Sequence, residues 1–245
     1  MGSEESRRPD SENTFSVWDI PMYSAPTVSK LIGLSVTRVR RWLMGYEYTY
    51  PAGPDLDLRT RHKGPVISRD EVADSNCASF YDLIDLLFVK KFLDHGISLQ
   101  KVRKALREAE ELIGGHHFAQ RIFFTDGKNI YLKVKNDADA LLELLSGGQW
   151  VIAPIIKQLA RQIDFDQPTG VARRWYPLGP SGLIVLDPRI SFGKPTLRGR
   201  GIATANVYDL FLGENESVNR VCSWMNLQSR EVEAAVNFER LLAAA

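Results

Sequence analysis

The pattern of apolar and polar residues between positions 23 and 43 predicts two short helices separated by a tight turn. Apolar residues recur at helical spacing on both sides of the turn, at Val28, Leu31, Ile32, Leu34, Val39 and Leu43. Gly33 interrupts the pattern where a reversing chain needs a left-handed residue. Ser35 is placed to cap the second helix, because its hydroxyl can accept a backbone N–H. The pattern is typical of a helix-turn-helix unit, whose second helix enters the major groove of DNA.

The second of these helices is strongly basic. Between Ser35 and Leu43 the chain carries three arginines and no acidic residue. Such a face suits the phosphates and base edges of duplex DNA. The candidate DNA contacts on this helix are Ser35, Thr37, Arg38, Arg40 and Arg41. The alternative is an ordinary pair of helices with a solvated charged face.

Residues 44–68 contain two alternating runs separated by a Pro/Gly turn, which predicts a β-hairpin. The first run carries Tyr46, Tyr48 and Tyr50, and the second ends in a basic cluster. A hairpin directly after a recognition helix is a wing, and its basic strand can lie on the phosphate backbone. The candidate backbone contacts are Arg59, Arg61 and Lys63, next to His62. The alternative is a loop with scattered charges.

Two longer helices are predicted after the hairpin. The first begins at Ser79, with Asp82 placed to complete a variant of the capping box, and Gly96 ends it. The second begins at Ser98 and carries an apolar stripe until Gly114-Gly115 ends it.

The remainder of the chain mixes strands and helices. A period of two from Arg121 predicts a hairpin that bends at Asp126-Gly127. The other expected elements are helices at 138–145 and 151–163, strands at 171–176 and 182–186, and helices at 203–212, 217–224 and 229–243. The last two helices have helix-turn-helix-like topology. Their acidic face repels phosphate, so they are expected to serve packing or dimerisation.

The length of 245 residues exceeds that of a usual single domain. We expect a mainly α fold with small β elements. Its parts are a flexible arm at 1–14, a winged helix-turn-helix domain at 15–115, a middle α+β segment of hairpin and helices at 116–180, and a C-terminal helical bundle at 181–245.

Composition is typical of a globular protein in a reducing cytosol. Apolar residues make up 44% and charged residues 25% of the chain. No uncharged apolar run approaches the ~18 residues of a membrane span, and the polar N-terminus has no signal-peptide pattern. Cys77 and Cys222 can pair, but so few cysteines favour a reducing compartment. We therefore expect a cytoplasmic protein without membrane contact.

Nothing in the sequence favours catalysis or a bound cofactor. His116-His117 have no cysteine or carboxylate at ligand spacing, so a metal site is not expected. Asp164 and Asp166 are read as a lone acidic pair without an acid–base partner. Phosphate-binding loops, nucleophile elbows and zinc-protease motifs are missing from the sequence. We expect neither enzyme activity nor a metal or cofactor.

Residues 23–113 resemble the MerR-type winged helix-turn-helix. The likeness lies in SKLIGLSVTRVRRW at 29–42 and HGISLQKVRKAL at 95–106. It implies a recognition helix, a wing and two supporting helices, bound to DNA as a homodimer. The chain departs from that family after Ile113, because Gly114-Gly115 end the helix where the family has a long dimerising coiled coil.

Residues 183–241 are similar to a family of small uncharacterised domains found in VapB-type antitoxins. The likeness lies in LDPRISFGKPTLRGRGI at 186–202 and FLGENESVNRVCSWMNLQSREVEAAVNFERLL at 211–242. Together the two resemblances imply the antitoxin of a bacterial VapBC-type pair. Such a protein represses its own promoter by binding double-stranded DNA and masks a PIN-domain ribonuclease toxin.

Three cations lie in the Gly- and Pro-rich loop of this second region, at Lys194, Arg198 and Arg200. Guanidinium groups held on a tight loop suit bidentate capture of carboxylates or phosphates. Because a PIN nuclease has an acidic centre, these residues are the candidate toxin contacts. The alternative is that Arg198 or Arg200 pins the loop internally, for instance to Asp187.

The main rival function is a MerR-like transcription regulator. In that case a small ligand would bind in the middle segment, at about 116–180. A ligand sensor has no need of the loop GKPTLRGRG, which favours the antitoxin.

Overall fold

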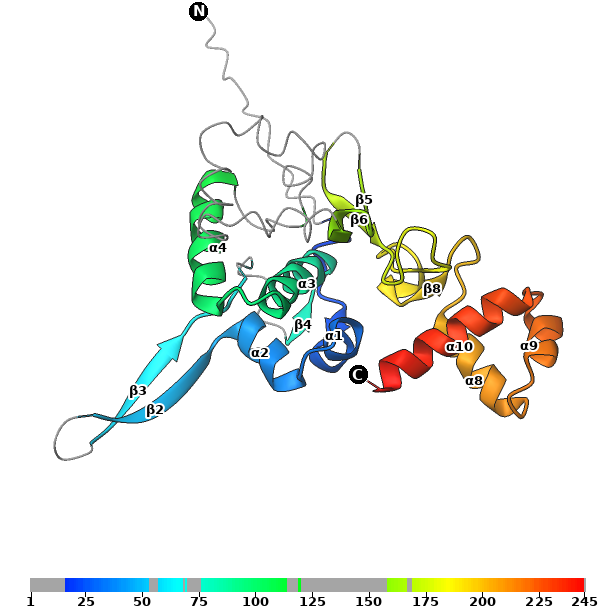
Figure 1. Cartoon of the computed structure of the whole chain (residues 1–245), viewed down its shortest axis with the longest axis horizontal. Helices are drawn as coiled ribbons and strands as arrows, with labels where there is room; N and C mark the ends of the chain where they lie inside the picture. Colours follow the sequence, from blue (N-terminus) through cyan, green and yellow to red (C-terminus); the bar gives the residue numbers. More distant parts are fainter. Residues whose placement is uncertain are drawn as a thin grey trace, which may run out of the picture.

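The computed structural model of the chain describes residues 16–52, 57–67, 69, 76–113, 119, 158–166 and 169–244. Helices and short antiparallel strand pairs surround two hydrophobic cores, one around α3 and one in the C-terminal helices (Figure 1). The arrangement mixes α and β elements, so "mainly α" is a coarse description of the part of the chain that is seen.

The predicted helix, turn and second helix at the N-terminal end are confirmed. Strand β1 (Tyr23–Ser24) leads into α1 (Ala25–Ile32), and α2 (Val36–Met44) follows. Gly33 ends α1 in the left-handed region, at φ 66° and ψ 48°. The Ser35 hydroxyl caps α2 by accepting from the backbone N–H of Arg38 at 3.4 Å. The α2 residues Val39, Trp42 and Leu43 are buried, which packs this helix against α1.

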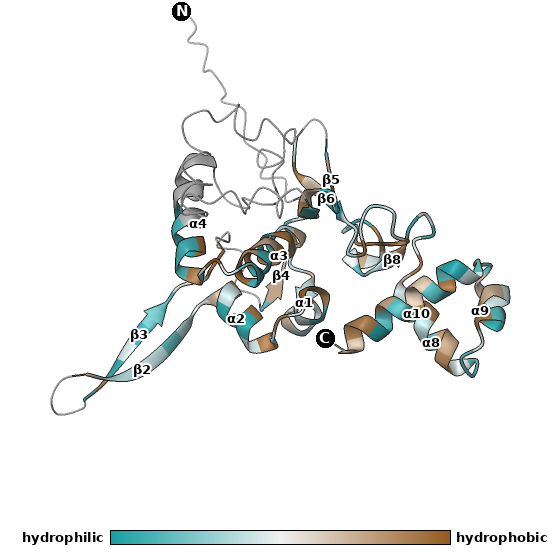
Figure 2. Cartoon of the chain, viewed as in Figure 1, coloured by the Kyte–Doolittle hydropathy of each residue, from teal (hydrophilic) through white to brown (hydrophobic). Residues whose placement is uncertain are grey.

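The predicted hairpin is also confirmed. Strands β2 (Tyr46–Ala52) and β3 (Asp57–Lys63) pair antiparallel from Tyr46↔Lys63 to Ala52↔Asp57. Figure 1 shows the pair projecting well away from the helices, and Figure 2 shows it as largely hydrophilic. The hairpin therefore contributes little to the core.

Helix α3 (Phe80–Asp94) is the centre of the first core, with nearly all of its N-terminal three turns buried. The predicted capping box is confirmed, because Ser79 Oγ accepts from the Asp82 N–H and the Asp82 carboxylate accepts from the Ser79 N–H. Strand β4 (Cys77–Ala78), just before α3, pairs with β1, and α4 (Leu99–Ile113) packs on α3. Helix α3 also packs against α1.

Chain segments far along the sequence complete this core. Strands β5 (Ile163–Phe165) and β6 (Ala172–Trp175) pair, and a bridge from Trp175 to Leu186 links them to β7 (Ile184–Val185) and β8 (Thr196–Leu197). Ile163, Ala172, Trp175 and Leu186 lie in the same core cluster as α1, α2 and α3.

The three predicted C-terminal helices are confirmed. They are α8 (Thr204–Gly213), α9 (Val218–Met225) and α10 (Ser229–Ala244), packed around Val207, Val221, Val232 and Phe238. Helix α9 ends at Asn226, which takes the left-handed conformation at φ 51°. Helix α10 also contacts α1, so this unit lies next to the N-terminal helices.

Several expectations lie outside the described residues. They are the arm at 1–14, His116-His117, the hairpin from Arg121, the helix at 138–145 and most of the helix at 151–163. The end of that last helix is wrong, since Ile163 belongs to strand β5. An apolar residue such as Ile163 can be buried in a helix or in a strand, so the apolar pattern at this position did not distinguish the two.

Candidate nucleic-acid interface and C-terminal loop

Helix α2 presents its basic residues to solvent. Thr37, Arg38, Arg40 and Arg41 are exposed, while the opposite face of the helix is buried against the core. Ser35 is exposed too, but its hydroxyl already accepts the capping hydrogen bond. In the part of the chain that is described, the three arginines form no ion pair with a carboxylate. Their charge is therefore available to a polyanion.

The base of the hairpin is anchored next to α2. The Val66 N–H donates to the Trp42 carbonyl at 2.8 Å, and Arg103 Nη1 donates to the carbonyls of Gly64 and Pro65 at 2.9 and 2.8 Å. Gly45, at φ 77°, makes the bend between α2 and β2, where a Cβ atom would collide with the Lys63 carbonyl oxygen. These contacts place the hairpin in a defined position beside the helix.

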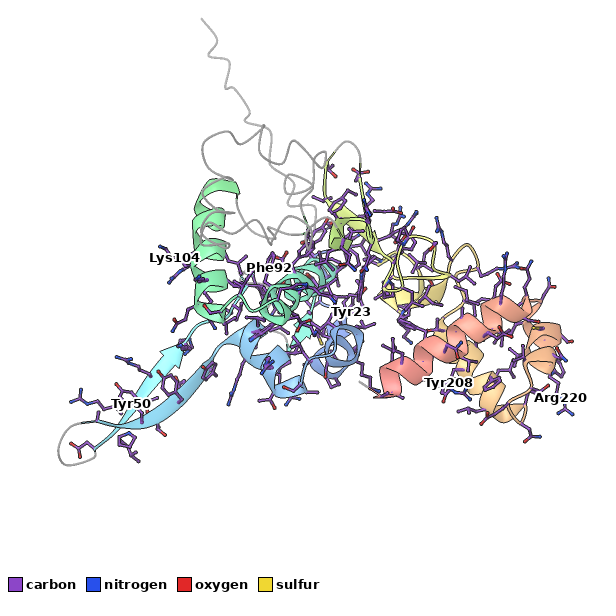
Figure 3. The ribbon with its side chains drawn as sticks, viewed as in Figure 1. Tyr23, Tyr50, Phe92, Lys104, Tyr208 and Arg220 are labelled. Atoms are coloured by element: carbon purple, nitrogen blue, oxygen red, sulfur yellow. The ribbon has the colours of Figure 1, made fainter. Side chains whose placement is uncertain are left out.

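One face of the hairpin combines aromatic rings and cations. Residues directly opposite each other in an antiparallel pair share a face. The register therefore places the pairs Tyr46/Lys63, Tyr48/Arg61 and Tyr50/Arg59 on one side. Figure 3 shows Tyr50 on the outer part of the hairpin. The other side carries Glu47, which lies 4.0 Å from His62.

This aromatic–cationic face, made of Tyr46, Tyr48, Tyr50, Arg59, Arg61 and Lys63, is continuous with α2. The Arg41 guanidinium carbon lies 4.8 Å from the centroid of the Tyr46 ring, and that of Arg61 lies 5.4 Å from the Tyr50 ring. In the sequence, the alternation of the tyrosines indicates only a strand. Their shared face with the cations follows from the register, which alternation alone did not supply.

The loop cations Lys194, Arg198 and Arg200 differ in their surroundings. Arg198 Nη1 donates to the Pro180 carbonyl at 2.8 Å, and its guanidinium lies 5.0 Å from the Tyr176 ring centroid. Arg200 binds the Glu231 carboxylate through Nε at 2.8 Å and Nη2 at 3.1 Å. Lys194 is exposed and forms no ion pair within the described residues. Arg200 therefore faces α10, whereas Lys194 faces solvent.

The Arg200–Glu231 pair holds the loop against the start of α10. Glu231 is buried, and its carboxylate also accepts the Gln228 N–H at 2.8 Å. The hydrogen bonds from Arg200 and Gln228 lower the pKa of Glu231 below its ordinary value. Arg200 thus binds a carboxylate within the chain. This agrees with the alternative that a loop arginine holds the loop internally.

We expect Arg200→Ala to lower the melting temperature more than Arg198→Ala. Loss of Arg200 leaves a buried carboxylate with one donor, whereas loss of Arg198 removes one hydrogen bond to an exposed carbonyl and the contact with the Tyr176 ring. Circular dichroism melts of the two variants measure the difference. Equal melting temperatures would show that the Glu231 pair contributes nothing to stability.

Asp187 was the example of an internal partner for Arg198 or Arg200, but neither arginine binds it. It is buried and accepts from Arg174 Nε at 2.8 Å and from Arg189 Nε and Nη2 at 3.1 and 2.8 Å. Burial alone raises the pKa of Asp187, but the hydrogen bonds from Arg189 and Arg174 lower it overall. Arg174 and Arg189 were missed by the sequence analysis, since neither stands in the Gly-rich loop.

Asp164 and Asp166 each have partners that the sequence did not indicate. Tyr176 Oη donates to Asp164 at 2.7 Å, and Arg173 Nη2 lies 3.1 Å from Asp166. The Thr169 hydroxyl donates to Asp166 at 2.7 Å, and its hydrogen bond lowers the pKa of Asp166. Both carboxylates thus hold the β5–β6 turn and the strands beside it.

An apolar hollow of about 360 Å³ lies between α1, α3, β6 and α10. It is lined by residues that include Leu31, Leu87, Trp175 and Leu241, with Lys30 and Lys91 among the lining. Most of the middle segment, where a ligand pocket was expected, lies outside the described residues, but its Gln162, Trp175, Pro177 and Leu178 line this hollow.

The described residues contain no cluster of three or more His, Cys, Asp or Glu side chains suited to a metal ion. The same residues contain no helix long and apolar enough to cross a membrane. Cys77 and Cys222 are not joined in a disulfide.

Comparison with known proteins finds one family model and several distant relatives. A family model described as "Protein of unknown function (DUF433)" matches residues 184–238. "Putative antitoxin VapB45" of Mycobacterium tuberculosis is 23% identical over 202 residues, covering 78% of this chain and 82% of that protein. "Uncharacterized HTH-type transcriptional regulator Rv1830" of the same species is 33% identical over 85 residues, covering 35% of this chain and 36% of that protein.

A solved structure shares the fold. The crystal structure of Rv2018 from Mycobacterium tuberculosis aligns with a TM-score of 0.62 at 19% identity, covering 89% of this chain and 98% of that one. The DUF433 match coincides with the C-terminal region singled out in the sequence. The chain is thus distantly similar to a protein named as an antitoxin and to helix-turn-helix regulators.

Proposed function

We propose that the chain is the antitoxin of a VapBC-type pair, which represses its own promoter and neutralises a PIN-domain ribonuclease. One observation supports the DNA-binding part most strongly. Exposed arginines of α2 without carboxylate partners in the described structure continue into the aromatic–cationic face of the hairpin. A surface of this length and charge fits duplex DNA.

In the proposed complex α2 lies in the major groove. Thr37, Arg38 and Arg40 face the base edges, where a bidentate arginine recognises guanine. The hairpin follows the adjacent backbone, so that Arg59, Arg61 and Lys63 neutralise phosphates and the tyrosine hydroxyls donate to phosphate oxygens. Glu47 on the opposite face of the hairpin stays away from the polyanion.

We propose that the protein acts as a homodimer on a palindromic site. One α2–hairpin unit covers one half-site, and two units with half-site centres about 34–36 Å apart, or a multiple of that, read the same face of the duplex.

The toxin-neutralising part of the proposal rests on the loop and on similarity. The relative named as a putative antitoxin aligns with 78% of this chain, which is more than the proposed DNA-binding part alone. Lys194, Arg198 and Arg200 were the expected toxin contacts. With Arg200 paired to Glu231, we assign direct contact to Lys194 and Arg198 and a positioning role to Arg200.

A ligand-responsive regulator is the second candidate, favoured by the similarity to the helix-turn-helix regulator and by the hollow beside α1. The two functions differ in what the neighbouring gene encodes. A short adjacent reading frame with several spaced acidic residues in an α/β pattern is expected for the antitoxin and not for the regulator.

The test combines DNA binding and ribonuclease inhibition. The purified chain should protect DNA upstream of its own gene in a footprinting assay, and co-expression should abolish the ribonuclease activity of the adjacent gene product. Protection without inhibition would support the regulator instead. Absence of protection on that DNA would refute the DNA-binding proposal.

A further inference from the structure

Phe192 is the most exposed large apolar side chain in the part of the chain that is described, at 86% of its full accessible surface. Its backbone is left-handed, at φ 54° and ψ 43°. Ser191, at φ 50°, and Gly193, at φ 71°, have left-handed φ values as well. A phenylalanine seldom adopts this conformation, because its Cβ atom crowds the following carbonyl oxygen.

Surrounding contacts hold this turn in place. Ser191 Oγ donates to the Gly201 carbonyl at 3.1 Å, and the Lys194 N–H donates to the Ser191 carbonyl at 3.2 Å. Tyr23 Oη, labelled in Figure 3, donates to the Gly193 carbonyl at 3.0 Å. Glycine at position 192 would form the same turn without strain. What phenylalanine adds at this position, and glycine would not, is a phenyl ring exposed to solvent.

A single exposed apolar side chain is common and needs no explanation by itself. This one is strained, held in a hydrogen-bonded turn and flanked in the sequence by basic residues. The segment 189–200 contains four basic residues and no acidic residue. Lys194 and Arg198 have no carboxylate partner in the described structure, and Arg189 shares Asp187 with Arg174. The surface is an aromatic anchor with a cationic border.

Two candidate partners for this surface, a second copy of the chain and duplex DNA, are disfavoured. In a second copy of the chain, the apolar hollow beside α1 carries Lys30 and Lys91. Those lysines would face Lys194 and Arg198, so like charges disfavour that contact. A phenyl ring enters duplex DNA only by unstacking a base step, which costs a few kcal/mol. The proposed DNA surface also lies on α2 and the hairpin, on the other side of α1 from β8 (Figure 1).

We propose that Phe192 is the anchor with which this chain binds an acidic protein. The ring enters an apolar pocket whose rim carries carboxylates, and these pair with Lys194 and Arg198. The inference rests on the proposed function, in which the partner is the ribonuclease. Because the anchor lies apart from the α2–hairpin surface, the chain can hold DNA and this partner together.

The test compares Phe192→Ala and Phe192→Gly with Trp224→Ala in the full-length chain. Trp224 is a matched control, since it is also an aromatic residue exposed to 71%. Affinity is measured by titration calorimetry against the adjacent gene product, and stability by urea denaturation. Both Phe192 variants should bind roughly thirtyfold more weakly or worse, whereas Trp224→Ala should bind like the wild type.

Stability separates an interaction role from a structural one. Glycine relieves the left-handed strain, so Phe192→Gly should shift the urea midpoint upward while binding is lost. A lower midpoint for this variant, or wild-type affinity for Phe192→Ala, would overturn the inference. If the wild-type chain itself does not bind the gene product, the toxin-neutralising function fails, and this inference fails with it.

Two further measurements test the chemistry of the partner. Lys194→Glu should also weaken binding, and the loss should diminish at high salt, where screening weakens the wild-type contact as well. A fluorescent single-stranded oligonucleotide serves as the competing probe, because a phenyl ring among cations can stack on a base. Oligonucleotide binding that depends on Phe192, with protein binding unaffected, would overturn the proposal in favour of nucleic acid.

Discussion

Replacement of Arg38 by alanine is expected to reduce the preference for operator DNA over unrelated DNA by roughly 5- to 150-fold. Arg38 is exposed at the start of α2, without an ion-pair partner in the described structure, where side chains of a recognition helix reach base edges. A bidentate arginine–guanine contact contributes about 1–3 kcal/mol of discrimination. Electrophoretic mobility shifts with the upstream DNA and a scrambled duplex measure the ratio.

Arg61→Ala is the matched control for this prediction. Arg61 is an exposed arginine on β3. In the proposed complex it contacts phosphate rather than bases. Its loss should weaken binding to both duplexes alike and reduce the slope of log affinity against log salt by about 1. If Arg38→Ala also weakened both duplexes equally, α2 would not be the element that reads the sequence.

Gly193→Ala is expected to destabilise the fold by about 3–4 kcal/mol, from left-handed strain and overpacking together. Gly193 is buried at φ 71°. A Cβ atom there would collide with Tyr23 Oη and come within 2.6 Å of Met22 Sδ. Tyr23 Oη also donates to the Gly193 carbonyl, so the collision breaks the contact between this loop and the strand that leads into α1. Urea denaturation measures the loss.

Gly199→Ala provides the control. Gly199 has nearly the same backbone, at φ 75°, but a Cβ atom there would meet nothing within 4 Å. It should therefore lose only the left-handed cost, about 1–2 kcal/mol. The difference between the two variants isolates the close packing on Tyr23. Equal losses of stability would mean that the loop shifts to make room for the Cβ atom, so that the packing of Gly193 on Tyr23 adds no cost.

Much of the α2–hairpin surface was predictable because its signals are local. Gly33 and Ser35 act on the next few residues, through a left-handed turn and a cap, and the structure confirms both. The hairpin follows from alternation on both sides of a Pro/Gly turn. The tyrosine face was not predicted, since it depends on which residue of β3 pairs with which residue of β2.

The C-terminal loop shows the limit of such reasoning. Its three cations are equivalent in the sequence, but Arg200 meets Glu231, 31 positions further along, and Arg198 meets a carbonyl 18 positions before it. The buried Asp187 takes Arg174 and Arg189 instead of a loop arginine. Which carboxylate finds which arginine depends on how α10 and β6 pack on the loop, and no local spacing encodes that.

The sequence by itself determined the helices α1, α2 and α3, the turn and caps at Gly33, Ser35 and Ser79, the β2–β3 hairpin and the basic character of α2. Backbone preferences and apolar periodicity act over a few residues, which is why these features could be read locally. The tertiary structure decided how the charges are used. Packing of α10 against the loop neutralises Arg200, and the β2–β3 register aligns the tyrosines with cations. The left-handed turn at Ser191–Gly193, held by Tyr23 and Gly201, raises Phe192 into solvent. These outcomes depend on contacts between distant residues, which form only when the chain has folded.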